Sequence, residues 1–349
     1  MELLERSPSY ADGTEDTFHS ATDEPVLQEA YDLFLQERIF AALRTLDTLS
    51  SERRAQLAHD ERYEAIQRVG RELPPFLADL DDCRDRAYVE AVRTRNMVVK
   101  FKRDLRTQLY QYHVTLDAHT PLENLCCILA EPDLFPELLW FLRDAQVLEI
   151  PTRVRRAVYV RYHAPWPFAD RVLFMTGRAF DALDETSPSI LLVIRSVQPS
   201  DTVAWQQAQK IRARPEQKQY VEIEARAAFE LRPLSPHKTR IRMTGVFDPK
   251  LKWVPKALIN WVSRKVVRYG MKRLAKSAAQ LQQLPTRHWQ RLHDDSWCDG
   301  LYPWMRRRLA EFWQRSLEQP CLSRSRLSAS LSISSDESTD DEYAQRRLA

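Results

Sequence analysis

The chain has 349 residues, a formal net charge of +3 and 44% hydrophobic residues, which is typical of a globular protein with a sizeable core. Its six glycines are too dispersed for a dinucleotide-binding loop, a P-loop or a nucleophile elbow, and its five cysteines show no CxxC spacing. No apolar run reaches the roughly 18 residues of a membrane span, and the first residues lack a secretory signal, so we expect a cytoplasmic protein.

Residues 1–25 are acidic and poor in apolar side chains, which predicts a disordered tail. Within it, Phe18, Ser20, Ala21 and Asp23 follow an acidic lead. This stretch resembles a phosphorylation-dependent FFAT motif, the peptide that docks on VAP receptors of the endoplasmic reticulum. The resemblance implies that Phe18 and Ala21 bind the receptor, that Asp23 fits the seventh position, and that a phosphate on Ser20 supplies the missing charge. A chance match in an acidic tail is the alternative.

Residues 26–94 have apolar side chains at helical spacing, which predicts a helical hairpin region. It is similar to a tetratricopeptide-like pair, but a second copy is missing, so a helical cap on the main domain is the favoured interpretation.

From about residue 95 the apolar period shortens to two, which predicts strands. Two short helices are expected between residues 121 and 150, and one long helix at Val254–Leu284. Because short turns join the strands, this order predicts an α+β fold. The expected strands are 97–105, 108–118, 155–163, 171–180, 190–197, 220–231 and 238–247.

Three segments appear in a characteristic order: WPFADR at Trp166–Arg171, ILLVIRSV at Ile190–Val197, and GVFDPKLKWVPKALINWV at Gly245–Val262. Together they resemble START (StAR-related lipid transfer) domains, which have a helix-grip fold, and the resemblance covers residues 95–284. It implies a curved antiparallel sheet that grips a long C-terminal helix. It also implies one phospholipid or other lipid in an apolar tunnel between them, without catalysis, metal or cofactor.

Strand alternation places Arg171, Leu173, Met175 and Gly177 on one face and Arg178 on the other. The resemblance makes Arg171, Leu173 and Met175 candidates for lipid contact, together with Val262 and Tyr269 of the closing helix. Arg195 is a second candidate for a head group, since guanidinium binds phosphate bidentately. Salt bridges at the rim are the alternative for both arginines. Gly177 stands where the family's sterol carrier has a second arginine, which weakens a sterol assignment.

No Asp or Glu lies between Pro249 and His293, so that the closing helix is strongly basic. Aromatic and basic residues interleaved in this way predict contact with an anionic membrane surface, with a solvated helix face as the alternative. Nucleic acid is not expected, because no reading motif is present. The expected surface residues are Lys252, Trp253, Lys256, Arg264, Lys265 and Arg268.

Residues 285–320 predict a basic and aromatic helical extension opened by Pro303, which either docks on the protein or inserts at a membrane interface. Its His288, His293, Asp294 and Cys298 match no metal-ligand spacing, so no metal site is expected. Residues 321–349 are Ser-rich and acidic, which predicts a second disordered tail.

The sequence therefore favours a lipid-binding and lipid-transfer protein, peripherally associated with membranes and tethered at contact sites of the endoplasmic reticulum. One alternative is a cyclase or hydrolase on the helix-grip fold, with His163 or Tyr162 as the acid/base group. Another is an interaction scaffold whose tunnel is filled by side chains, which a cavity below about 300 Å³ would favour.

Overall fold

The computed structural model describes residues 15–82, 87–103, 109–164, 166, 168–248, 250, 266–283 and 285–318, with side chains from residue 24 onward. The chain divides into two compact units, Met1–Met305 and Arg306–Ala349. No helix in the described ranges combines the length and apolar character of a membrane span. The elements below belong to the first unit, except that the last helix continues into the second.

The helices that precede the sheet are α1 (Glu15–Leu35), α2 (Ile39–Asp47), α3 (Ser51–Gln56), α4 (Glu61–Glu72) and α5 (Pro74–Asp81), with a 3₁₀ turn at Leu57–His59. They share a core that contains the fully buried Leu27, Ile39, Leu46 and Ile66. Helix α1 begins at Glu15. The predicted disordered tail of residues 1–25 is therefore wrong for the backbone from Glu15 onward. The first turns of α1 run through the acidic stretch.

One mixed sheet follows, with the strand order β1-β2-β3-β10-β9-β7-β6-β5-β4. Neighbouring strands are antiparallel, and the short β8 pairs in parallel with β6 at the end of the sheet. The strands are β1 (Val89–Thr94), β2 (Met97–Arg103), β3 (Tyr110–Ala118), β4 (Leu142–Thr152), β5 (Arg155–Tyr162), β6 (Arg171–Ala182), β7 (Ser189–Ser196), β8 (Val221–Glu222), β9 (Glu224–Ser235) and β10 (Lys238–Asp248).

Three elements differ from the sequence-based expectations. Strands β1 and β4 were expected to be helical, and helix α8 (Thr202–Arg212) was not expected at all. The strands contain good helix formers, but β1 pairs with β2 and β4 pairs with β5 as the outer strands of the sheet. Pairing with a neighbour therefore outweighs local propensity at both edges.

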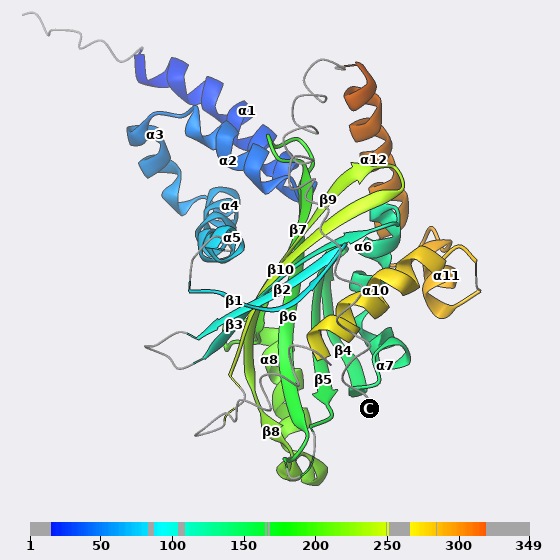
Figure 1. Ribbon diagram of the computed structural model, residues 1–349. Helices are drawn as coiled ribbons and strands as arrows, with labels where there is room; N and C mark the ends of the chain where they lie inside the picture. The colour runs from blue at the N-terminus through cyan, green and yellow to red at the C-terminus, as the bar shows by residue number, and fades with distance from the viewer. Residues whose placement is uncertain are drawn as a thin grey trace, which may run out of the picture. The chain divides into compact units, whose positions relative to one another are not determined.

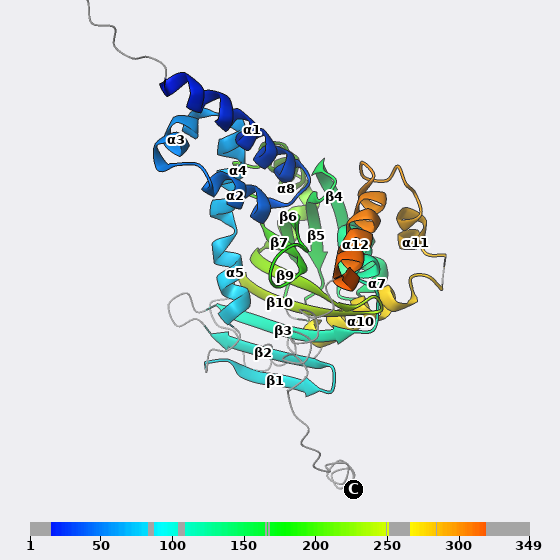
Figure 2. The ribbon, with the colours of Figure 1, turned by 90° about the horizontal axis from the view of Figure 1, so that it is seen from above.

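The two faces of the sheet carry different covers. On the outer face α8 packs against Val172 and Phe174, while the N-terminal helices pack over Phe180, Ala182 and Leu191. Figures 1 and 2 show α1–α5 on one side of the curved sheet and α10 on the other. The inner, concave face is thus left for the helices that close the domain.

The inner cover consists of α6 (Leu122–Ala130), a 3₁₀ turn (Pro132–Leu134), α7 (Phe135–Leu138), α10 (Arg268–Gln280), α11 (Arg287–Leu292) and the start of α12 (Leu301–Glu318). Helix α10 is the described portion of the expected long helix, since residues 251–265 lie outside the described ranges. The Asn124 side-chain amide donates a hydrogen bond to the Ala278 carbonyl at 2.9 Å and fixes α6 against α10. The α+β architecture with a curved sheet gripping a C-terminal helix is confirmed.

Candidate functional site

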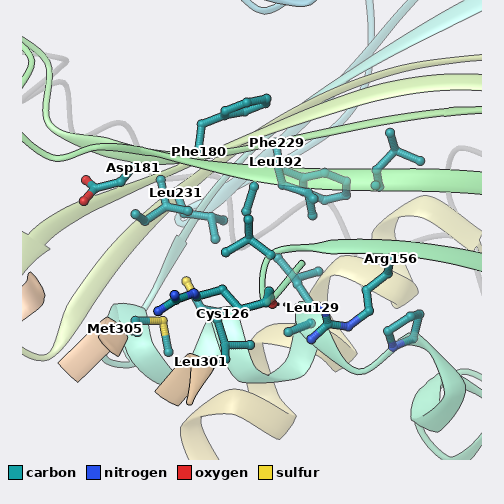
Figure 3. A pocket seen from close by; sticks show the side chains of 18 of the residues that line it. Cys126, Leu129, Arg156, Phe180, Asp181, Leu192, Phe229, Leu231, Leu301 and Met305 are labelled. Atoms are coloured by element: carbon teal, nitrogen blue, oxygen red, sulfur yellow. Dashed lines mark hydrogen bonds between the residues drawn. The ribbon is translucent and has the colours of Figure 1, made fainter. Parts of the chain in front are cut away.

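An apolar cavity lies between the inner face of the sheet and the helices that cover it (Figure 3). Every second residue of β5, β6, β7 and β9 points inward and forms its floor, because side chains alternate along a strand. Helices α6 and α10 and the first turn of α12 form the opposite wall. The lining includes Val158, Met175, Gly177, Ala179, Ile190, Leu192, Ile194, Phe229 and Leu231 from the sheet, and Cys126, Leu129, Leu274, Leu301, Tyr302 and Met305 from the helices.

The cavity has a volume of about 170 Å³. Pockets that hold drug-sized ligands begin at about 300 Å³, so this conformation has no room for a whole two-chain lipid. The charged residues of the described lining are Arg153, Arg156 and Asp181. The cavity is thus suited to an aliphatic group, and its size keeps the filled-tunnel scaffold open as an alternative.

The C-terminal extension forms part of the cavity wall and is held there by Glu131, a carboxylate that is 2% exposed. Its Oε1 accepts hydrogen bonds from the Tyr302 hydroxyl at 2.6 Å and from the Trp297 indole at 2.7 Å. Its Oε2 accepts from Arg291 at 2.5 Å, and Arg291 also binds Asp133 at 2.7 Å. Up to Met305 the extension therefore docks on the protein, which is one of the two alternatives predicted for it.

Arg156 is a charged lining residue that was not predicted from the sequence. It projects inward from β5 toward the α6 side of the cavity and is 7% exposed (Figure 3). Its Nη1 donates to the carbonyls of Thr152, Arg153 and Arg155, whereas its buried Nη2 has no hydrogen-bond partner among the described residues. Strand parity from Val158 could have found it. A buried cation of this kind favours an anionic neighbour, since isolated buried charge is costly.

Solved structures with the same arrangement of sheet and helices are known. The crystal structure of human STARD10 superimposes with a TM-score of 0.51 at 15% identity, over 65% of this chain and 86% of that one. The chain has the START fold.

Two more distant matches with this fold are human StAR-related lipid transfer protein 5 and the ZhuI aromatase/cyclase from Streptomyces sp. R1128. The first has a TM-score of 0.47 at 12% identity and covers 67% of this chain and all of that one (100%). The second has a TM-score of 0.33 at 11% identity and covers 49% and 94% of the two chains. No family model matches the sequence, and no curated protein matches it.

The predicted alternation along β6 is confirmed. Met175 and Gly177 line the cavity of the START fold, while Arg178 lies on the outer face. Leu173 is 1% exposed and shares the inner face, but it is not among the described residues that line the cavity. Arg171 lies at the first position of β6, where its guanidinium donates to the Ala169 carbonyl and burial lowers its pKa. It does not reach the cavity lining.

The placement of Arg195 in the tunnel is wrong. On β7 the inward residues are Ile190, Leu192 and Ile194, so Arg195 points to the outer face. There its guanidinium binds Asp201 through two bonds, of 2.7 and 3.0 Å. The register of β7 could not be read from the residues alone, and a shift of one residue exchanges the two faces of a strand.

The remaining predicted positions are only partly described. Val262, Lys252, Trp253, Lys256, Arg264 and Lys265 lie outside the described residues, as do the side chains of Phe18, Ser20, Ala21 and Asp23, whose backbone belongs to α1. Arg268 is the first residue of α10. Tyr269 is 40% exposed and contacts Trp140 edge-on, with ring centroids 6.4 Å apart, and it does not line the cavity.

The acid/base candidates of the enzyme alternative are likewise away from the cavity. His163 Nδ1 lies 3.2 Å from Asp170 Oδ1, and burial raises the pKa of Tyr162 to about 12. Neither side chain is among the lining residues that the structure describes. Burial also raises the pKa of the Cys126 thiol, which does line the cavity, and a protonated thiol is a poor nucleophile.

The described residues contain no cluster of His, Cys, Asp or Glu that could hold a metal ion. Trp166 lies in the connection between β5 and β6. Its side chain is 92% exposed, so it is not a packed tryptophan of the kind found in an ordinary turn.

Proposed function

We propose that this protein binds one lipid in the cavity between the sheet, α6, α10 and the extension, and carries it between membranes. The observation that supports the proposal is the predominantly apolar lining of that cavity in a START fold. Burial of each methylene group stabilises a bound chain by about 0.8 kcal/mol, so no chemical step is needed to explain such a site. The proposal accordingly assigns no catalytic residue.

The cavity volume and Arg156 narrow the ligand class. About 170 Å³ suits part of one aliphatic chain, so the ligand in this conformation is a single-chain amphiphile. Its anionic head group, a carboxylate or a phosphate, lies toward Arg156, where a buried Nη2 has no partner among the described residues. A larger lipid enters only if α10 or the extension moves away from the sheet, and access to Nη2 also requires side chains to move.

Membrane docking is assigned to the exposed aromatic pair Trp140 and Tyr269, which are 46% and 40% exposed. The basic Arg268 and Lys272 lie on α10, on either side of Tyr269 in the sequence. Aromatic rings favour the interface and each basic residue adds about 1 kcal/mol near an anionic surface. We place the protein in the cytoplasm and peripherally on anionic membranes, and we retain as a proposal that phospho-Ser20 and Phe18 tether it to a VAP receptor.

The test is displacement of a fluorescent fatty acid from the purified protein. Ala179→Phe fills the cavity floor and should lower affinity at least about tenfold, since the chain loses most of its buried methylene contacts. Ala213→Phe adds the same ring at an exposed position after α8 and should bind as the wild type does. Equal affinity of the two variants would contradict the proposed site.

The second candidate function is an interaction scaffold whose tunnel is filled, and the small cavity volume favours it. A protein that binds no fatty acid, lysolipid or two-chain phospholipid above background, and that Ala179→Phe destabilises because its interior is already filled, would support the scaffold instead.

A further inference from the structure

A second hollow, of about 660 Å³, lies on the outer face of the sheet, opposite the apolar cavity. It is bounded by the α1–α2 turn and α4 on one side and by the start of α8 on the other. The outer face is covered by apolar packing at both of these ends, under the N-terminal helices and under α8. The stretch of sheet between the two packed regions lines the hollow with the polar side chains of Arg155, Thr176, Arg178 and Arg195, next to the apolar Phe180 and Val193.

The floor of this outer cleft is formed by Arg155 of β5, Arg178 of β6 and Arg195 of β7. Arg155 and Arg178 are direct cross-strand partners, and Arg195 pairs with Thr176 on the neighbouring strand. Like charges directly opposite on a sheet are destabilising, so a row of three arginines needs negative charge beside it.

The protein supplies that charge incompletely. Arg155 and Arg195 share one carboxylate, Asp201, at distances of 2.7 to 3.0 Å, and Arg178 binds Glu37 at 2.9 Å. Three guanidinium groups on the floor thus face two carboxylates. In the walls, Arg68 lies 3.5 Å from Glu64, Arg153 lies 3.8 Å from Asp299, and Glu72 is a further carboxylate, so the excess of positive charge is confined to Arg155 and Arg195, which share Asp201.

We propose that this outer cleft is a second ligand site, which binds a water-soluble phosphate ester with its phosphate over Arg155 and Arg195. Guanidinium groups bind oxyanions, and these two already hold a carboxylate, since Arg195 donates two bonds to Asp201 and Arg155 donates one. A phosphate has three terminal oxygens and can therefore contact both guanidinium groups beside Asp201. The hydroxyls of Thr176 and Ser200 lie in the same lining, and the volume is that of a small-molecule pocket.

The cleft and the apolar cavity lie on opposite faces of the sheet and share only Arg153 and Phe180 among their described lining residues, so pyrophosphate binding can be tested separately from lipid binding. Isothermal titration of the full chain with pyrophosphate, at constant ionic strength set with sodium chloride, tests it directly. Arg155→Gln should weaken pyrophosphate binding at least about tenfold, while Asp201 keeps its bonds to Arg195 and the variant stays folded. Arg214→Gln, an exposed arginine outside the cleft, is the matched control and should bind as the wild type does.

A second variant leaves every charge in place. Ala65→Trp puts a bulky ring from α4 into the hollow and should abolish pyrophosphate binding without changing the displacement of a fatty acid from the apolar cavity. Equal loss in Arg155→Gln and Arg214→Gln would reveal a general charge effect and overturn the site. So would undiminished binding to Ala65→Trp, or the absence of any saturable heat with the wild type. If phosphoinositide vesicles bound the wild type and Ala65→Trp equally well, phosphate would be recognised on another surface, and the proposed site would be wrong.

Discussion

Replacing Glu131 by glutamine tests how the C-terminal extension is attached. The carboxylate is 2% exposed and accepts bonds from Tyr302, Trp297 and Arg291. Glutamine keeps the shape and one acceptor, but it removes the charge that faces Arg291, whose side chain is 14% exposed. Removing one partner of a buried ion pair costs about 3 to 5 kcal/mol, and Asp133 still holds Arg291, so we expect a loss of about 3 kcal/mol in the free energy of unfolding.

Urea denaturation followed by tryptophan fluorescence measures this loss. Glu137→Gln is the matched control, because Glu137 pairs with Arg287 at 2.8 Å on the surface, with both side chains about half exposed, and should cost less than about 1 kcal/mol. Limited proteolysis should also cut Glu131→Gln faster between α10 and α12, where the extension loses its anchor. If the two variants were equally stable and equally resistant to protease, the anchoring role of Glu131 would be refuted.

Three further predictions concern pH, the membrane and the head group. Burial lowers the pKa of both His113 and His288 to about 4, so only the unfolded chain gains these protons between pH 6.5 and pH 4 and stability falls as pH falls. Each histidine should lower the free energy of unfolding by about 2 kcal/mol between pH 7 and pH 5. In urea titrations at the two pH values, His113→Gln should remove the contribution of His113, and an unchanged pH dependence would contradict the prediction. Trp140→Ser with Tyr269→Ser should reduce flotation with phosphatidylserine vesicles several-fold, and Val203→Ser, an exposed position on α8, should not. Arg156→Met should weaken a fatty acid relative to the matching fatty alcohol by about tenfold, and an unchanged ratio of the two affinities would show that Arg156 does not meet the head group.

The sequence predicted the strands that carry strong alternation, and it failed at elements whose structure depends on partners. Strands β5, β6, β7, β9 and β10 were located within a few residues of their observed bounds. The edge strand β4 was missed because its Leu, Glu and Gln favour helix, and only its pairing with β5 makes it a strand. Helix α8 lies in a stretch of mixed polar residues, and its burial follows from docking on Val172 and Phe174.

The site residues, like the strands, were predicted correctly where a local pattern determines them and wrongly where distant partners do. Alternation along β6 correctly separated Met175 and Gly177 from Arg178, because the strand's own pattern fixed the two faces. Arg195 was assigned to the wrong face, since nothing in the sequence linked the register of β7 to that of β6. The outer cleft joins α1, α4 and three strands that are far apart along the chain, so no local pattern could reveal it.

The most direct test of lipid binding is native mass spectrometry of the protein purified from cells. The proposed site predicts one bound single-chain amphiphile per chain, which is lost in the Ala179→Phe variant and retained in Ala213→Phe. A protein that carries no lipid, or an equal lipid load on both variants, would contradict the claim that the apolar cavity is the binding site.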